Sequence, residues 1–302
     1  MKIILTGSLG HIGSTLATTL VQKGHSVTVI TSKAERKNEI VNIGAIAAVG
    51  SIDNVDFLTE TFKGADIVYL MEPPINFLDA DIIMDTYWQA IAKSYVEAIL
   101  NSGVTKVIHL SSIGAHTDKG VGMLAAHYWV ENILKELPHA VSIKTMRPVG
   151  FYYNMFAFIP AIKNANAIIQ NYNTNEKEPW VSPLDIAAAI TEEMEKPFNG
   201  RSIRYIASDE VTPHEVAKIL GEAIGKKDLK WLAITDDEFV GNLVRAGFIE
   251  QNAKGLANMN AARMNDTLYE DYNRNKPTLG QVKLTDFAKD FANAYHSSNN
   301  HH

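Results

Sequence analysis

Three glycines near the start of the chain, Gly7, Gly10 and Gly13, have the spacing of a loop that binds phosphate groups. An apolar segment precedes them, and leucines at helical spacing follow them. A strand that turns tightly into a helix points the free N–H groups of that helix at a pyrophosphate. We expect Gly7 to form the turn, Gly10 to let phosphates approach the backbone, and Gly13 to let the helix pack closely. A glycine-rich turn without a ligand is the alternative. The other loop residues expected to contact such a dinucleotide are Ser8, Leu9, His11 and Ile12.

The residues after the second expected strand, 26–31, indicate which dinucleotide the loop would hold. Folds that select NAD usually place an Asp or Glu about 20 residues after the glycine loop, where it accepts hydrogen bonds from a ribose hydroxyl. The strand tip here is followed instead by Ser32, Lys33, Arg36 and Lys37. A hydroxyl and three cations suit a 2′-phosphate, so the sequence predicts NADP(H) in preference to NAD(H). The alternative is that these are ordinary charges at a solvated helix start.

Residues that follow the later strands should gather at the same edge of the sheet. We expect Asp53 to lie beside the adenine, or to cap the helix that starts near residue 55, or both. Glu72 and Pro73 break the fourth strand abruptly, which opens its end toward a ligand crevice. The residues at these strand ends that we expect to contact the cofactor are Asp53, Met71, Glu72, Pro73, Ser111, Pro148 and Phe151.

Alternating strands and helices must position these residues. Each expected strand is a continuous apolar run with short connections to a helix, which is typical of a parallel sheet covered on both faces. The expected strands are residues 2–6, 26–31, 43–49, 65–71, 106–110, 141–146 and 200–207, and the longer helices between them are residues 83–101, 123–137 and 183–196. The sequence therefore predicts an α/β fold with a doubly wound parallel sheet of the Rossmann kind.

The chain changes character after the sixth strand. Residues 151–160 are rich in aromatic side chains, and residues 164–178 are polar, as expected of a loop. Beyond residue 210 we expect helices that cap the strand ends, at 212–224, 235–247 and 281–295, and the first begins with a capping box. These patterns predict a dinucleotide-binding domain of residues 1–150 and 181–208, a smaller, mainly helical capping domain of residues 151–180 and 209–296, and a disordered tail of residues 297–302.

Composition excludes several classes of function. The formal net charge is -6 and the isoelectric point is near 5.9, so the surface attracts nucleic acid weakly and we expect no nucleic-acid partner. The chain has no cysteine, which rules out disulfides, thiolate metal sites and a thiol nucleophile. No apolar run approaches the length needed to span a membrane, and no signal-peptide pattern opens the chain. We expect a cytoplasmic protein with no membrane partner.

These residues together resemble the NmrA-like group of atypical short-chain dehydrogenases. The resemblance covers most of residues 1–210 and implies a dinucleotide-binding fold with a small, discontinuous second domain. The motifs that carry it are Thr6-Gly7-Ser-Leu-Gly10-His-Ile-Gly13, Ser111-Ser112-Ile-Gly114-Ala115, His127-x-x-x-Glu131, Arg147-Pro148-Val-Gly-Phe151-Tyr-Tyr-Asn154 and Trp180-Val-Ser-Pro183-x-Asp185.

The resemblance also exposes a departure. Active short-chain dehydrogenases use a Ser, a Tyr and a Lys, the last two one helical turn apart so that they share one face. In this sequence Ile113 stands at the usual Ser position, Met123 at the Tyr position and His127 at the Lys position. Tyr128 is present but lies about 100° around the helix from the required face. We therefore do not expect proton-coupled oxidation of alcohols.

A histidine at the Lys position has two readings. His127 would hydrogen-bond the nicotinamide ribose while Glu131, one turn later, orients its other nitrogen, which makes His127 a candidate catalytic residue. The alternative is a structural histidine that is satisfied by Glu131. One His with one carboxylate is too sparse for a metal site, and we expect none.

Aromatic residues after the sixth strand are the candidates for a substrate pocket. Their clustering favours a site for a flat apolar ligand, although aromatic residues are individually more often part of a core. The expected pocket residues are His116, Tyr152, Tyr153, Phe156 and Trp180, next to Phe151.

Two functions of different classes fit these observations. The first is an NADPH-dependent reductase of a quinone-like or other conjugated small molecule, because such an acceptor needs stacking and orientation more than a positioned tyrosine. The second, which the resemblance implies, is a redox sensor that binds the dinucleotide without turnover and changes its contacts with a protein partner.

Overall fold

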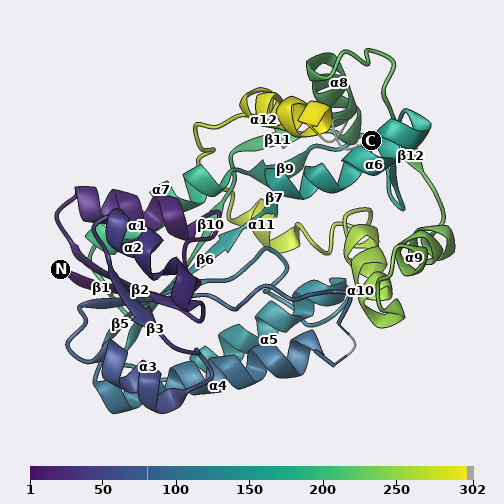
Figure 1. Cartoon of the computed structure of the whole chain (residues 1–302). Helices are drawn as coiled ribbons and strands as arrows, with labels where there is room; N and C mark the ends of the chain where they lie inside the picture. Colours follow the sequence, from purple (N-terminus) through teal and green to yellow (C-terminus); the bar gives the residue numbers. More distant parts are fainter. Residues whose placement is uncertain (80, 298–302) are drawn as a thin grey trace.

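A seven-stranded, wholly parallel sheet forms the centre of the computed structural model, which describes residues 1–79 and 81–297 (Figure 1). The strand order is β10-β6-β5-β4-β1-β2-β3, so the chain starts in the middle and winds outward in both directions. The strands are β1 (Lys2–Leu5), β2 (Ser26–Thr31), β3 (Ile46–Val49), β4 (Ile67–Leu70), β5 (Lys106–Leu110), β6 (Ser142–Pro148) and β10 (Arg201–Ile206). The predicted α/β doubly wound fold is confirmed.

Helices cover both faces of this sheet (Figure 1). Side chains of α1 and α7 pack with one face of β1, β4 and β6, and side chains of α3, α4 and α5 pack with the other. Successive residues of a strand point to opposite faces, so a strand between two helical layers must be apolar throughout. The helices are α1 (Gly13–Gln22), α2 (Lys37–Asn42), α3 (Val55–Phe62), α4 (Met84–Ser102), α5 (Ala125–Leu134) and α7 (Pro183–Glu195), with 3-10 turns η1 (Ala34–Arg36) and η2 (Gly122–Leu124).

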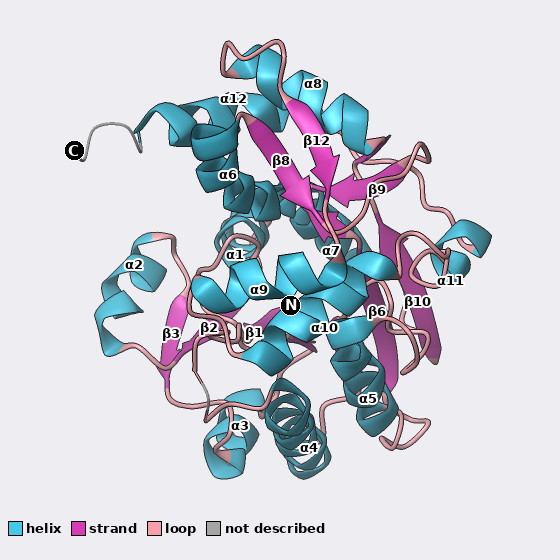
Figure 2. Ribbon diagram, turned by 90° about the vertical axis from the view of Figure 1, so that its right-hand side faces the viewer, coloured by secondary structure: helices cyan, strands magenta, loops and turns pink. Residues whose placement is uncertain are grey.

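A second core lies beside the sheet, in the upper part of Figure 2. Aromatic residues dominate it, and they come from the segment after β6 and from the last helix. Its elements are η3 (Tyr152–Phe158), α6 (Ile159–Ala165), β8 (Ala167–Gln170), α8 (Pro213–Ala223), β12 (Lys230–Ala233) and α12 (Leu284–Ser297). Strands β7 (Gly150–Phe151), β9 (Glu178–Val181) and β11 (Asp209–Val211) form a small sheet between the two cores.

The polar segment 164–178 is a loop, as its composition predicts, only over residues 171–177. It contains β8, which pairs in parallel with β12, and it leads directly into β9. The pairing partner lies about 60 residues later in the chain, so no local pattern reveals it. The capping box predicted at Thr212 is present, with the Thr212 hydroxyl and the Glu215 carboxylate each accepting a backbone N–H of the other residue.

A helical hairpin, α9 (Asp236–Arg245) and α10 (Glu250–Ala261), extends over the carboxyl side of the sheet, followed by the short helix α11 (Glu270–Arg274). Helix α9 matches the predicted helix 235–247, whereas α10 and α11 were not predicted. The loop between β4 and α4 meets the hairpin, because the Phe77 and Phe248 rings stack at 6.1 Å and the Phe77 carbonyl accepts the N–H of Ile249. The hairpin is therefore tied to the strand end that should face the cofactor.

The predicted tail begins at the last residue of α12, Ser297, and residues 298–302 lie outside the described part of the chain. Within residues 1–79 and 81–297, no helix combines the length and hydropathy needed to cross a lipid bilayer.

Candidate functional site

The glycine loop joins β1 to α1, and its three glycines meet different surroundings. A Cβ on Gly7, whose φ is +86°, would stand 2.1 Å from the Met71 sulfur, and a Cβ on Gly13 would stand 2.1 Å from the Ser8 carbonyl oxygen. A Cβ on Gly10 would meet nothing closer than the Gly7 carbonyl oxygen at 3.8 Å. The outer two glycines therefore serve close packing, while the space over Gly10 and the start of α1 is open to a pyrophosphate.

Arg36 connects the loop with the residues predicted to select the cofactor. It is half-buried, and its Nη1 donates a 3.4 Å hydrogen bond to the Ser8 hydroxyl. Ser32, Lys33 and Lys37 are exposed on the same segment. The structure thus places a cation against the glycine loop, where the adenosine half of a dinucleotide would lie. Arg36 and the exposed Ser32, Lys33 and Lys37 therefore fit the adenosine half of such a dinucleotide.

Asp53 follows the third strand, β3, and the structure contradicts one of the two roles expected for it. Helix α3 is capped by Asn54, whose side-chain oxygen accepts the Phe57 N–H at 3.0 Å. Asp53 is exposed beside this cap. It is therefore not the helix cap, and its contact with adenine stays a prediction.

The end of β4 is tied down by buried polar contacts. Met71 fills the space beside Gly7, and its N–H donates to the Thr6 hydroxyl at 2.9 Å. Glu72 is buried, with Oε1 3.1 Å from Nε2 of the fully buried His109 on β5. Burial alone would raise the pKa of Glu72, but the interactions of its carboxylate with His109, with His127 and with its own backbone N–H together lower the pKa. Pro73 follows and accepts the indole N–H of Trp88 at 2.9 Å.

His127 lies on α5 with its ring against Trp88, 4.8 Å between centroids. Its Nδ1 is buried and has no hydrogen-bond partner in the described structure. Burial lowers the pKa of His127 to about 4, and the nearby Glu72 carboxylate offsets only part of that effect. The ring is therefore neutral at pH 7, so it can form hydrogen bonds but is not charged as an acid.

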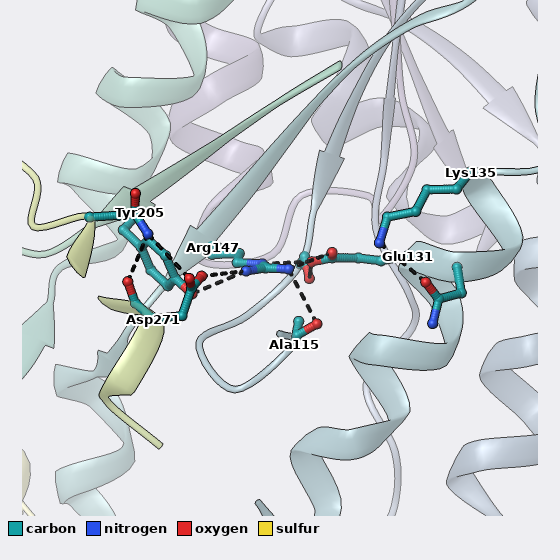
Figure 3. A network of polar contacts seen from close by, with 9 residues as sticks. Ala115, Glu131, Lys135, Arg147, Tyr205 and Asp271 are labelled. Carbon is teal, nitrogen blue, oxygen red and sulfur yellow. Dashed lines mark hydrogen bonds and ion pairs between the residues drawn. The ribbon is translucent and has the colours of Figure 1, made fainter. Parts of the chain in front are cut away.

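Glu131 does not bind His127, so the role of Glu131 in both sequence-based readings is wrong, while the contact of His127 with the nicotinamide ribose stays a prediction. Its carboxylate accepts hydrogen bonds from Nε and Nη2 of Arg147, at 2.8 and 2.7 Å (Figure 3). It also accepts one from the Ser111 hydroxyl at 2.6 Å. A two-pronged guanidinium is a stronger partner for a buried carboxylate than a neutral imidazole. The hydroxyl of Ser111 therefore donates its proton to Glu131 and could only accept a hydrogen bond from a cofactor, so its contact with a cofactor stays a prediction.

Arg147 is the centre of a larger buried network (Figure 3). Its Nη1 donates to Asp271 on α11 and to the Tyr205 hydroxyl, at 3.0 and 3.1 Å, and the Tyr205 hydroxyl donates to Asp271 at 2.7 Å. Nη2 also donates to the Ala115 carbonyl. Arg147 therefore joins β6, α5 and α11 beneath the strand ends.

The predicted aromatic pocket is divided by the structure. Tyr152 and Phe156 pack against Phe287 in the second core, and Trp180 is buried against the guanidinium of Arg263, 5.5 Å from the ring centroid. For these three residues the structure shows core packing instead of an open pocket wall. The last helix supplies the aromatic partner of Tyr152 and Phe156, and Arg263 covers Trp180, and the local sequence reveals neither partner.

Tyr153 and Phe151 remain beside the glycine loop. Tyr153 stacks on His11 at 4.6 Å and lies 5.1 Å from the Phe151 ring. Burial raises the pKa of Tyr153 to about 12. The structure thus brings the segment after β6 onto the loop that should hold the pyrophosphate, and Pro148 ends β6 below it.

His116 is partly exposed, and its ring lies next to the backbone of Thr267. Burial of the ring lowers its pKa. Sequence reasoning missed His109, Arg147 and Trp88 as part of the site. For His109 the signal was available, since a charged or polar residue inside an apolar strand requires a buried partner.

Comparison with known proteins supports this picture. Among solved structures, the chain is similar to an NADPH-dependent quinone oxidoreductase from Escherichia coli in complex with NADPH, with a TM-score of 0.79 and 18% identity over 95% of this chain and 99% of that one. It is also similar to a Citrobacter sp. triphenylmethane reductase complexed with NADP(H), with a TM-score of 0.73 and 20% identity over 96% and 100% of the two chains. A nucleoside-diphosphate-sugar epimerase from Staphylococcus aureus gives a TM-score of 0.77 and 17% identity over 96% and 100%.

At these identities the likenesses show the fold. No curated protein sequence gave a significant match. The sequence profile of the NmrA-like family matches residues 1–288, nearly the whole chain. With the glycine loop, the parallel sheet and the helical C-terminal part in place, the chain belongs to the NmrA-like family.

Proposed function

We propose that the protein is an NADPH-dependent reductase that passes hydride to a quinone-like or other conjugated small molecule. The observation that carries this proposal is the cradle between β1 and α1, where Gly7 and Gly13 are closely packed and the space over Gly10 is open. Backbone N–H groups at the start of α1 would hold the pyrophosphate there. When bound, NADPH would supply the hydride.

The preference for NADP(H) rests on Arg36. Its contact with Ser8 brings a guanidinium to the loop, and Ser32 and Lys33 lie exposed nearby. A guanidinium binds a phosphate through two parallel hydrogen bonds, which suits a 2′-phosphate better than a ribose hydroxyl.

The missing Ser, Tyr and Lys favour a conjugated acceptor over an alcohol or ketone. A quinone that takes up one hydride becomes a quinol anion, whose oxygen can take a proton from solvent without a positioned tyrosine. His127 is neutral near pH 7, so its ring would act in the site as a hydrogen-bonding group and not as a positive charge. Two fold neighbours are described as a quinone oxidoreductase and a triphenylmethane reductase, which supports the same class of reaction.

Rapid mixing tests the proposal directly. Protein loaded with NADPH is mixed with a panel of quinones and azo dyes while the absorbance of the reduced nicotinamide is followed. We expect at least one acceptor to accelerate NADPH oxidation above the rate without protein. Failure of the entire panel, with NADPH binding established separately, would contradict the reductase function.

The second candidate is a redox sensor that binds NADP(H) without turnover. The observation that favours it is the presence of Ile113, Met123 and His127 where active short-chain dehydrogenases have the catalytic Ser, Tyr and Lys. A sensor must bind oxidised and reduced cofactor with different affinity, since a ligand can shift an equilibrium only by its differential affinity for two states. Unequal affinities, together with a changed proteolysis pattern in residues 151–180, would support it.

A further inference from the structure

A cavity of about 670 Å³ lies between the start of α4, the η2 turn and the start of α10. Its volume falls within the range of about 300–1,000 Å³ that is usual for small-molecule sites. The three walls come from the loop after β4, from the segment before α5 and from the C-terminal hairpin.

The cavity is one helical turn away from His127. Met84 and Met123 line it, and the residues four positions later on the same faces are Trp88 and His127, whose rings are in contact. Trp88 in turn donates to the carbonyl of Pro73 at the end of β4. The cavity therefore adjoins the end of β4 and His127, the histidine that the sequence predicts to contact the nicotinamide ribose.

The walls are held in place by close contacts. A Cβ on Gly122 would stand 2.4 Å from the Gly255 carbonyl oxygen, so η2 and α10 meet backbone to backbone. On the opposite side, the Phe77 carbonyl accepts hydrogen bonds from the Ile249 N–H and the Asn252 side chain. The cavity is consequently preformed, which lowers the entropic cost of binding a ligand.

The lining combines an apolar surface with an excess of carboxylates. The apolar residues are Ile82, Ile83, Met84, Met123 and Ile249. Three carboxylates, Asp79, Asp85 and Glu250, face a single lysine, Lys254, in the described lining. Lys254 is already paired with Glu250 at 2.7 Å. Asp85 is exposed at the mouth of the cavity and has no ion-pair partner among the described residues, and partial desolvation raises its pKa.

The positive ends of two helix dipoles reduce this excess of negative charge without cancelling it. Helices α4 and α10 both begin at the cavity, and each N-terminus contributes about half a positive charge. The wall therefore keeps about one net negative charge. A ligand that carries a negative charge would be repelled, and a flat ligand with a positive charge would be attracted.

We propose that this cavity is the acceptor site, and that it takes flat conjugated cations in preference to anions of the same shape. The inference rests on the proposed reductase function, since the acceptor is the second substrate of such an enzyme. Stacking against the methionine and isoleucine side chains would hold the ring system, and Asp85 would set the charge preference.

Binding of a matched pair of ligands tests the site without turnover. Isothermal titration calorimetry on the full chain loaded with NADP⁺ compares a 1,4-naphthoquinone that carries a trimethylammonium group with one that carries a sulfonate. We expect the cation to bind about tenfold more tightly. Asp85→Asn should reduce that ratio about threefold, whereas Asp56→Asn, which removes an exposed first-turn carboxylate from α3, should leave it unchanged.

The position of the site is tested by filling it. Ile83→Trp should weaken binding of the cation at least about tenfold while NADPH binding stays as in the wild type, which also shows that the variant is folded. Equal or tighter binding of the sulfonate, or a ratio that Asp85→Asn does not change, would overturn the charge preference. NADPH oxidation that Ile83→Trp leaves intact would place the acceptor elsewhere. Cation binding that depends on Asp85, with no NADPH oxidation, would support the site and contradict the reductase function.

Discussion

Around the glycine loop, some residues are needed for close packing and others are positioned to bind a ligand. Gly7 and Gly13 leave no room for a side chain, because Met71 and the Ser8 carbonyl occupy that space. A side chain would fit at Gly10 without a clash, so the fold itself does not require a glycine there. Only a ligand that approaches the backbone at Gly10 would require one. Arg36, held against Ser8, is the residue best placed to read the charge of that ligand.

Arg36→Ala should separate the two cofactors. One charge-assisted hydrogen bond contributes about 1.5–3 kcal/mol, so NADPH affinity should fall by about 10- to 100-fold while NADH affinity changes little. Fluorescence titration of both cofactors measures this. The exposed neighbour Lys37 provides the matched control, Lys37→Ala, for which we expect a smaller effect. An equal loss for NADPH and NADH would contradict selection by Arg36.

His127 should make the fold sensitive to mild acid. Its pKa is about 4 in the folded protein and near 6.5 when exposed, so the unfolded chain binds more protons between these values. Stability should therefore fall as the pH drops from 6.5 toward 4. Between pH 6.5 and pH 4, the free energy of unfolding of His127→Asn should fall by about 2–3 kcal/mol less than that of the wild type. Urea unfolding at the two pH values measures this difference.

The exposed His139 supplies the control, since His139→Asn should follow the wild type. If His127→Asn shows the same pH dependence as the wild type, the ring is not buried in its neutral form.

At the residue scale, the sequence predicts the glycine loop well but not the partners of charged side chains. The i,i+4 spacing of His127 and Glu131 is real, yet Arg147 from β6 takes the Glu131 carboxylate. Long-range partners of this kind are fixed by the tertiary structure, and helical spacing gives no information about them.

Arg147 connects several elements beneath the carboxyl ends of the parallel strands. It joins α5 through Glu131, α11 through Asp271 and the turn after β5 through the Ala115 carbonyl. Because both Arg147 and Glu131 are almost fully buried, their charges cannot be compensated by water if one partner is removed.

Arg147→Met should therefore destabilise the protein by about 3–5 kcal/mol, as measured by urea unfolding. The double variant Arg147→Met, Glu131→Leu should recover part of that loss, because it no longer leaves the Glu131 charge unpaired. A single variant that loses less than about 1 kcal/mol would show that the network contributes little.

Element boundaries were predictable where apolar periodicity is strong. Strands β2 and β5 match the predicted ranges, and α4 ends where Gly103 adopts a left-handed conformation. Helix α10 was missed because its buried residues, Ala253, Ala257 and Asn260, give no apolar stripe that distinguishes it from a polar loop. Strand β8 was missed because its partner β12 is remote in the chain.

In the whole molecule, two cores meet at the carboxyl ends of the parallel strands. The sheet and its helices carry the glycine loop, while the C-terminal hairpin closes the cavity beside Met123 and His127. The second core was the least predictable part, since it assembles aromatic residues from positions 152–172 and 284–295. A ligand that spans the loop and the cavity would stabilise the chain as a whole.

Binding of NADPH to Gly10→Ala tests the central claim most directly, because that substitution fits the fold but blocks the approach of a pyrophosphate. Fluorescence titration and the thermal midpoint of the free protein are measured for the wild type, Gly10→Ala and the matched control Gly241→Ala on α9. We predict that only Gly10→Ala loses affinity, by at least about tenfold, with the midpoint of the free protein nearly unchanged. Wild-type affinity in Gly10→Ala, or no NADPH binding by the wild type, would contradict the account.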